Sequence, residues 1–449
     1  MADETPGGDR RSVVALLVAV FCSAAASSAA VTTLGKQVFD LTSRELDLGL
    51  LGLAEFAPAA VLVLVTGHVA DRFDRRRVAA IGIGVEAAAA LLLAAYAASN
   101  PTAAGPIFPV VVLLGVGRAF VAPSARSLPA DVVAPERLSW LIPRYSATWQ
   151  GAIIAGPVLA GFLYAVDESL PYVAMAALLV AGAAAILLVR VRPAVAVATG
   201  ATDEPVVDAA LLEAGVAPTE GRTGVAPPSR RAGLHEALEG LRFIRRQPIL
   251  LGAIGLDLFA VLFGGAVALL PAIATERLGT DSVGLGWLRA AGGIGAALVT
   301  LVLARRPLNR RVGRRLLAAV ALFGLGTIAL GLTHDYVVAL VAMAVLSGAD
   351  AISVFIRATL VPLVTPAHMR GRVLAVENVF IGASNELGAF ESGVVGQALG
   401  VAPAVVLGGG ATLVVALAWS VLFPALRAVD RFPTGPDPDP AEAIAAETA

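Results

Sequence analysis

The chain has 449 residues, of which 57% are hydrophobic and 15% are charged, and its mean hydropathy is +0.81. A soluble domain carries about 25% charged residues, so this composition excludes a soluble enzyme, a nucleic-acid-binding protein and a disordered protein. The single cysteine, Cys22, excludes a disulfide framework and a thiolate metal cluster. The formal net charge of −1 says little, because in a membrane protein the position of each charge matters more than the sum.

Long apolar runs fill the chain outside residues 1–11, 191–247 and 429–449. A transmembrane helix needs about 20 apolar residues, and the remaining length suits twelve such helices with short connections. Continuous apolar runs favour helices over a β-barrel, whose strands would alternate in hydropathy. We therefore predict an all-α integral membrane protein with twelve transmembrane helices, at 12–34, 47–69, 78–98, 106–125, 138–165, 171–190, 248–274, 283–304, 313–333, 336–363, 372–399 and 401–426.

The first predicted span also has features of a cleavable signal peptide. Arg10 and Arg11 precede an apolar run that reaches the small residues 23–27. The apolar run continues past Leu34, and eleven more spans follow it. We therefore expect the first span to be retained.

The distribution of positive charge predicts the orientation. If the N-tail 1–11 is cytoplasmic, 26 of the 33 Lys and Arg residues fall in cytoplasmic segments. Only Lys36, Arg44 and Arg277 fall in outer loops. By the positive-inside rule, both termini, including the C-tail 429–449, lie in the cytoplasm, and the chain is a multi-pass protein of the cell membrane.

The long segment 191–247 divides the spans into two groups of six, at 12–190 and 248–428. Its first part, including residues 206–228, is rich in Ala, Pro, Gly, Thr and Val and is typical of a flexible linker. Its last part carries apolar residues at helical spacing among basic ones and predicts an amphipathic helix on the inner leaflet. A calmodulin-like target segment is the alternative. The residues of this pattern are Leu234, Leu238, Leu241 and Ile244, with Arg242, Arg245 and Arg246.

A charged motif stands between the second and third spans. It begins at Gly67, continues through Asp71 and Arg72, and ends at Arg75 and Arg76. It resembles the signature G-x-x-x-D-R-x-G-R-R/K of the major facilitator superfamily, whose members have six plus six helices around a central cytoplasmic loop. Asp74 replaces the second glycine of that signature, which puts the tightness of the turn in doubt.

Further stretches resemble narrower branches of this superfamily. In span five, Gly151, Gly156, Pro157 and Gly161 are similar to a Gly-Pro motif of its antiporters. Ordinary close packing of the helix is the alternative interpretation of this motif. Three segments are similar to bacterial exporters related to the enterobactin exporter, among which are drug exporters, namely 123–126, 239–248 and 366–373.

The resemblance implies a gate at the cytoplasmic surface. It implies that Asp71 holds the two halves together near the start of span eleven, where Arg370 and Arg372 lie. The alternative is that the arginines of the motif, Arg72, Arg75 and Arg76 among them, only enforce topology and bind anionic lipid.

Charged residues inside a membrane span are costly and are functional candidates by default. In the resembled fold, spans one, four, seven and ten line the central cavity, and these spans carry Arg118, Asp257, Asp350 and Arg357. Asp257 is nine residues into its span, about 14 Å at 1.5 Å per residue, which places it near the midplane. Asp350 and Arg357 share a helical face, so we expect them to pair with each other or across the cavity. Glu386 on span eleven joins these candidates for proton coupling and substrate binding.

Other charges in the spans receive different interpretations. Arg144 and Glu377 lie near cytoplasmic ends and are expected to reach the membrane surface. Glu86 lies on span three, which is peripheral in the resembled fold, and the sequence suggests no role for it.

No pattern of catalytic or cofactor-binding residues is evident. The four histidines have no metal-ligand spacing, and a phosphate-binding G-x-x-x-x-G-K motif is absent from the sequence. We therefore expect no enzyme activity, no cofactor and no metal, and an ion gradient as the energy source.

These features together predict a secondary active transporter that exports a small amphiphilic molecule, such as a drug, siderophore or other metabolite, in exchange for protons by alternating access. Its expected partners are the substrate, protons and membrane lipid, with no nucleic acid, and we expect a monomer. The alternatives are an uncoupled facilitator or an importer, and a membrane sensor or enzyme that transports nothing.

Overall fold

The computed structural model describes residues 7–190 and 230–433. Within these ranges, side chains are outside the description at 7–9, 63–65, 67, 68, 70, 71, 123–127, 135, 136 and 230–237. The predicted linker 206–228 and both tails beyond these ranges therefore lie outside the described residues.

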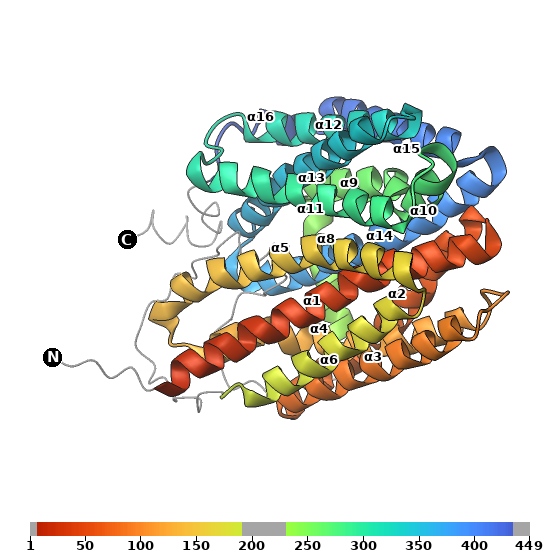
Figure 1. Ribbon diagram of the computed structural model, residues 1–449. Helices are drawn as coiled ribbons and strands as arrows, with labels where there is room; N and C mark the ends of the chain where they lie inside the picture. The colour runs from red at the N-terminus through yellow and green to blue at the C-terminus, as the bar shows by residue number, and fades with distance from the viewer. Residues whose placement is uncertain (1–6, 191–229, 434–449) are drawn as a thin grey trace, which may run out of the picture.

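The first half of the molecule is a bundle of six long helices, which cross it in alternating directions (Figure 1). A core of Ala, Val, Leu and Ile lies between them. Small residues let the helices approach closely: a Cβ on Gly156 would lie 2.4 Å from the carbonyl oxygen of Ala25. The helices are α1 (Gly7–Thr42), α2 (Glu45–Arg72), α3 (Arg75–Ala98), α4 (Ile107–Val132), α5 (Pro135–Val166) and α6 (Leu170–Leu188).

The second half repeats this plan with a second bundle, drawn in green to blue beside the first in Figure 1. Asp281 and Asp335 cap two of its helices by accepting hydrogen bonds from the backbone N–H groups of Gly284 and Val338, which satisfies amides that a helix start leaves free. The bundle contains α9 (Pro248–Phe263), α11 (Ser282–Arg305), α12 (Val312–Leu332), α13 (Tyr336–Val364), α14 (Ala367–Leu399) and α15 (Val401–Leu422), followed by the short α16 (Pro424–Ala428).

The seventh predicted span, 248–274, is not one continuous helix. After α9 the chain continues as η1 (Gly265–Leu269), α10 (Leu270–Ala272) and η2 (Ile273–Arg277). The break falls at Gly264 and Gly265, and a Cβ on Gly265 would lie 2.4 Å from the carbonyl oxygen of Gly388 on α14. Glycine is therefore required here because the broken helix lies directly against the backbone of its neighbour.

Nine helices in the described ranges are long and apolar enough to cross a membrane by length and composition. The other crossings are α2, α4 and α14. The apolar part of α4 counted in this way is shorter, at Ile107–Ala122, and α14 carries three glutamates within its span. Twelve crossings in two bundles therefore agree with the predicted fold class, although most helices extend beyond the predicted boundaries.

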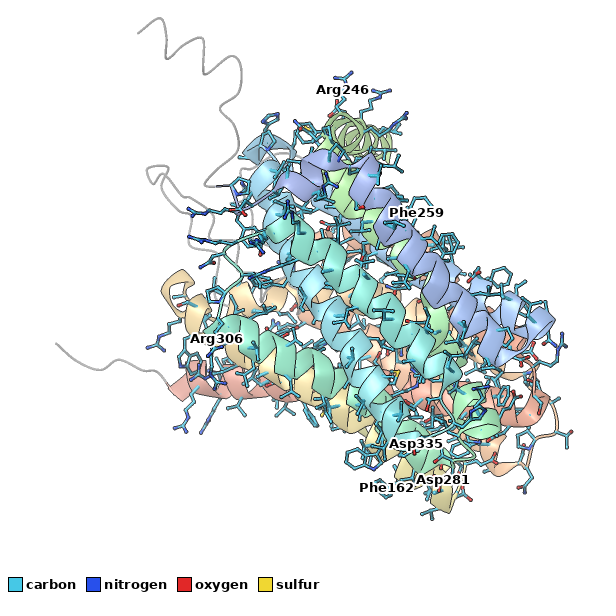
Figure 2. All side chains as sticks on the ribbon, turned by 90° about the horizontal axis from the view of Figure 1, so that it is seen from above. Phe162, Arg246, Phe259, Asp281, Arg306 and Asp335 are labelled. Atoms are coloured by element: carbon cyan, nitrogen blue, oxygen red, sulfur yellow. The ribbon has the colours of Figure 1, made fainter. Side chains whose placement is uncertain are left out.

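The two ends of the molecule differ in charge (Figure 2). Arg246 and Arg306 lie toward the end where α1 begins and α15 finishes, which we call the terminal end. Asp281 and Asp335 lie at the opposite end, the distal end, beside Phe162.

The two halves touch at the distal end. There α2 packs on α14, where a Cβ on Gly49 would lie 3.0 Å from the Cα of Phe390. Similarly, α5 packs on α11, and the hydroxyl of Ser282 donates a hydrogen bond of 2.9 Å to the carbonyl oxygen of Gly161. Near the middle of the same helix pair, Gln150 donates to the carbonyl oxygen of Gly293 at 2.8 Å.

The predicted amphipathic helix is present as α8 (Arg230–Arg246). Ile244 is buried against the terminal ends of α9 and α14, and Glu239 forms an ion pair of 2.8 Å with Arg372. Arg242, Arg245 and Arg246 are exposed. Leu241 and Ile244 therefore pack against the second bundle, where Val373 and Val376 provide an apolar surface for them, whereas Leu238 is exposed. The position of α8 on the inner leaflet stays a prediction.

Candidate functional site

A large cavity of about 540 Å³ lies between the two halves. It reaches Leu128 and Ile186 near the terminal ends of α4 and α6, and it extends inward to Arg118 near the middle of α4. The contacts between the halves at the distal end lie beyond its inner limit. The cavity is therefore closed toward the distal end and lies in the terminal half of the molecule.

Both arginines predicted for the cavity line it. Arg118 comes from α4 and Arg357 from α13, which are the fourth crossing helices of their respective halves. Aromatic side chains from α5, Tyr145 and Trp149, and the amide of Asn378 from α14 also face the cavity. The walls therefore combine apolar surface with a cationic group from each half.

Arg357 is the centre of a buried cluster of charges in the second half. Its Nη2 lies 2.7 Å from Oδ1 of Asp257, and its Nη1 lies 3.6 Å from Oε1 of Glu377. The exposed fractions of the three residues are only 4% to 6%. Asp257 is therefore the partner of Arg357 in this structure. The expectation that Glu377 reaches the membrane surface is wrong, because its side chain turns into the protein toward Arg357.

Asp350 lies on the other side of this cluster. It faces a small, separate cavity that also includes Asp257 and Ser353, rather than the large cavity between the halves. The structure records no ion pair between Asp350 and Arg357 in the described part of the chain. The carboxylate of Asp257 forms the ion pair with the guanidinium of Arg357 instead.

Arg118 is surrounded by carboxylates in the first half. It forms an ion pair with Glu55 of α2, and its Nε lies 3.7 Å from Oε2 of Glu86 on α3. Glu86 is buried and lines the large cavity. Although α3 corresponds to a peripheral span of the resembled fold, the side chain of Glu86 reaches the cavity. A Cβ on Gly117 of α4 would lie 2.7 Å from Cγ of Glu86, so this glycine leaves room for the side chain to pass α4.

Glu386 approaches the same cluster from the second half. Its Oε2 lies 2.8 Å from the position that a Cβ on Gly52 of α2 would take, and it interacts electrostatically with Arg118. The predicted candidate Glu386 is therefore placed at the interface between the halves, against the helix that also carries Glu55.

Each arginine is outnumbered by carboxyl groups. Glu55, Glu86 and Glu386 accompany Arg118, and Asp257, Asp350 and Glu377 accompany Arg357. Charges removed from water must be neutralised by partners or by protons. The excess of carboxyl groups at the site can therefore be neutralised by protons or by a positive charge on a bound molecule.

The loop motif between α2 and α3 is partly described. Gly67 and Asp71 lie in α2, but their side-chain surroundings are outside the described part, so the gate at Asp71 stays a prediction. Arg72 is exposed, and Arg75 forms an ion pair of 3.1 Å with Asp131. Arg370 on α14 donates to the carbonyl oxygen of Pro362 at 3.3 Å, while Arg372 pairs with Glu239 of α8.

Asp74, which stands where the resembled motif has glycine, has its own function in the turn. Its carboxylate accepts a hydrogen bond from the backbone N–H of Arg76. It also forms an ion pair of 2.9 Å with the side chain of Arg76. The side-chain hydrogen bond from Arg76 lowers the pKa of the Asp74 carboxyl. The backbone at Asp74 has φ −60°, so the turn does not require glycine and the carboxylate caps α3.

The residues of the glycine motif in α5 differ in whether they touch a neighbouring helix. Gly156 packs on α1, and Gly161 packs on α11, where its Cβ would lie 2.4 Å from the carbonyl oxygen of Ser282. The carbonyl oxygen of Pro157 lies 2.5 Å from the position of a Cβ on Gly286. By contrast, Gly151 has open space around its Cβ position. Gly156, Pro157 and Gly161 therefore set helix contacts, and the last two join the halves.

Comparison with known proteins gives results consistent with this geometry. The sequence profile described as Major Facilitator Superfamily matches residues 16–389. The chain is 24% identical over 410 residues to the "Multidrug efflux pump Tap" of Mycolicibacterium fortuitum, covering 87% of this chain and 90% of that protein.

Solved structures share the fold at low sequence identity. A variant of the nucleoside transporter NupG is 13% identical with a TM-score of 0.68, covering 92% of this chain and 100% of that chain. A bacterial homologue of the human lysosomal transporter Spinster, described as inward-facing and unoccupied, is 13% identical with a TM-score of 0.61, covering 95% and 97% of the two chains.

Proposed function

Since the chain belongs to the major facilitator superfamily and is a membrane transporter rather than an enzyme, we propose that it exports a small amphiphilic molecule in exchange for protons. The observation that carries this proposal is the cavity between the halves, which is lined by an arginine from each half, each outnumbered by neighbouring carboxyl groups. In alternating access, the contacts between the halves at the distal end would open and the terminal end would close, so that the cavity becomes accessible from the distal side.

The orientation is part of the proposal. The terminal end carries most of the arginines, and the positive-inside rule places such an end in the cytoplasm. The cavity then faces the cytoplasm in this conformation, which is the loading state of an exporter. The membrane is the plasma membrane, and the transporter works as a monomer.

Orientation is tested with a membrane-impermeant maleimide on intact cells in a Cys22→Ala background. A cysteine introduced by Glu168→Cys at the distal end should react from outside. A cysteine introduced by Asp430→Cys should react only after the cells are permeabilised. The reverse pattern overturns export from this loading state.

Proton exchange is assigned to the cluster around Arg357. Protonation of Asp257 removes the charge that holds the guanidinium, and Arg357 is then free to favour Glu377 at the wall of the large cavity. Protonation of Asp257 would thereby change the ion pairing of Glu377 at the wall of the large cavity. This is the link that an antiporter requires, because proton binding and cargo binding must change each other's free energy.

The cargo is assigned from the cavity walls. Tyr145 and Trp149 offer flat apolar surface, and Glu86 and Glu377 offer carboxyl groups. Such walls suit an amphiphilic molecule that is neutral or cationic. The relative from Mycolicibacterium fortuitum is named a multidrug efflux pump, which supports the same class of cargo.

The coupling is tested in proteoliposomes with ethidium, a cationic amphiphile, and an imposed pH gradient. Wild-type protein should accumulate ethidium against its gradient, and an uncoupler should abolish this. Asp257→Asn should still bind ethidium and move it downhill, but it should lose uphill transport; Asp350→Asn should behave alike. The control is Glu168→Gln in an exposed loop. Undiminished uphill transport by both single variants and their double variant would remove these carboxyls from the mechanism, and uncoupler-insensitive transport would favour a facilitator.

A further inference from the structure

A second, much smaller cavity lies behind the Asp257–Arg357 ion pair. Asp257 and Ala260 of α9 border it on one side, and Asp350 and Ser353 of α13 border it on another. α12 closes it with apolar side chains, including Phe323. The space for the centre of a water-sized molecule is about 10 Å³, which is close to the minimum for one bound water.

The hydroxyl of Ser353 is the second observation at this place. Ser353 is only 3% exposed, and its Oγ has no hydrogen-bond partner among the described groups. A helical serine commonly satisfies its hydroxyl on the carbonyl one turn earlier, as Thr359 does on the same helix with Phe355. The unsatisfied hydroxyl of Ser353 instead borders the small cavity together with two carboxyl groups.

We propose that this small cavity is a proton-binding site in which one water molecule bridges the carboxyl groups of Asp257 and Asp350 and the hydroxyl of Ser353. The site rests on the proposed proton coupling and specifies where the proton is held. Three polar groups around one water match the usual number of hydrogen bonds of a buried water. Ser353 is a positioning residue, because it fixes the water and carries no proton of the cycle itself.

The charged groups that face this site come from three helices. Asp257 comes from α9, Asp350 and Arg357 come from α13, and Glu377 comes from α14. The α12 residues that line the site are apolar and not titratable. With all three carboxyls ionised, the cluster would hold two negative charges in excess, so at least one proton is expected among them.

The proton step is a transfer through the water. The O–H bond of protonated Asp350 breaks, an O–H bond forms on the carboxylate of Asp257, and the bridging water is regenerated. Asp257 becomes neutral and loses its hold on Arg357, whose other contact is Glu377 in the large cavity. The small cavity is thus connected to the cargo site by one guanidinium.

The test uses ethidium in proteoliposomes, with two variants that change the site without removing a carboxyl. Ser353→Ala removes the hydroxyl, and Ala319→Val places two methyl groups at the wall formed by α12. Both should lower uphill transport at least about tenfold and should reduce the protons moved per ethidium, measured with a pH dye. Downhill transport should be unchanged, and Ser353→Thr, which keeps a hydroxyl, should restore coupling.

The matched control is Ser384→Ala. Ser384 is equally buried on α14, but its hydroxyl is already bonded to the carbonyl oxygen of Ile381. Thermal melting of each variant checks that it is folded. If wild type is coupled and both site variants keep the wild-type proton count, the small cavity is not the proton site, although the proposed function stands. If a sodium gradient at constant pH drives wild-type uptake, the site binds a metal cation and the inference is overturned. If no gradient drives wild-type uptake, the proposed function fails first.

Discussion

The hydroxyl of Ser282 on α11 donates a hydrogen bond of 2.9 Å to the carbonyl oxygen of Gly161 on α5. This bond joins the two halves at the distal end, one turn from the place where Gly286 lies against the carbonyl of Pro157. The close approach depends on the glycines, because a side chain on either would meet the backbone of the other helix. The resembled antiporter motif thus includes a contact that can exist only while the distal end is closed.

We predict that Gly161→Val opens the distal end. Its Cβ would lie 2.4 Å from the carbonyl oxygen of Ser282, so the two helices must separate and the distally closed conformation is destabilised. Spin labels on Glu168→Cys and Asp281→Cys, in a Cys22→Ala background, should report longer distances. Gly151→Val on the same helix is the control, because its Cβ position is open. A distance distribution equal to wild type would show that this contact does not hold the end closed.

Glu86→Gln should weaken the binding of ethidium by about tenfold, or 1.4 kcal/mol. The carboxylate lines the large cavity, and Arg118 is already paired with Glu55. The loss of Glu86 therefore removes a carboxyl group from the wall without freeing the arginine. Equilibrium binding by fluorescence measures the effect. The comparison is Glu391→Gln, a carboxyl of α14 away from the residues that line the cavity; equal affinity in all three proteins would contradict a role in cargo binding.

Asp74 should contribute stability that depends on pH. Its pKa is lowered by the side-chain hydrogen bond from Arg76, so the stabilisation is present above the pKa of the unfolded chain and is lost as pH falls through the lower folded pKa. Asp74→Ala should lose the cap of α3, about 1 kcal/mol. Asp74→Asn keeps a capping oxygen without the charge.

Thermal melting in detergent at a series of pH values separates the two effects. The difference between wild type and Asp74→Asn should be largest near neutral pH and should shrink below about pH 4. The group is largely exposed, and solvent screens part of the ion pair, so the charge effect should be smaller than that of the cap. A difference that grows on acidification would refute the assignment.

At the terminal end, Glu239 and Asp71 are expected to compete for the guanidinium of Arg372. In the present conformation Glu239 of α8 holds this guanidinium at 2.8 Å, whereas the family resemblance assigns it to a gate with Asp71. We predict that Asp71→Asn favours the conformation with an open terminal end and that Glu239→Gln favours closure there. Each should shift the equilibrium by about 1–3 kcal/mol.

Opposite changes in the labelling rate of a cysteine in the wall of the large cavity, introduced by Ala122→Cys, would show the competition. Arg242→Gln, a change at an exposed residue one turn from Glu239 on α8, is the control. If Asp71→Asn transports ethidium at the wild-type rate and leaves labelling unchanged, the gate assignment is wrong.

Much of the architecture could be predicted from the sequence. The lengths of the apolar runs predicted twelve crossings, because the bilayer sets the length of a helix whatever its neighbours are. The motif between α2 and α3 indicated the superfamily. The charges inside the spans identified Arg118, Asp257 and Arg357, because an ionised group in hydrocarbon is costly wherever the helix faces.

The tertiary structure decided which of these charges meet. Hydropathy fixes how long a helix is but not its rotation or tilt, which packing against neighbours sets. Glu377 therefore turns toward Arg357 instead of the membrane surface, and Glu86 reaches the cavity through the space left by Gly117. Asp350 belongs to a separate small cavity with Ser353 for the same reason: residues seven apart share a helical face, but only the neighbouring helices determine which carboxyl reaches the guanidinium.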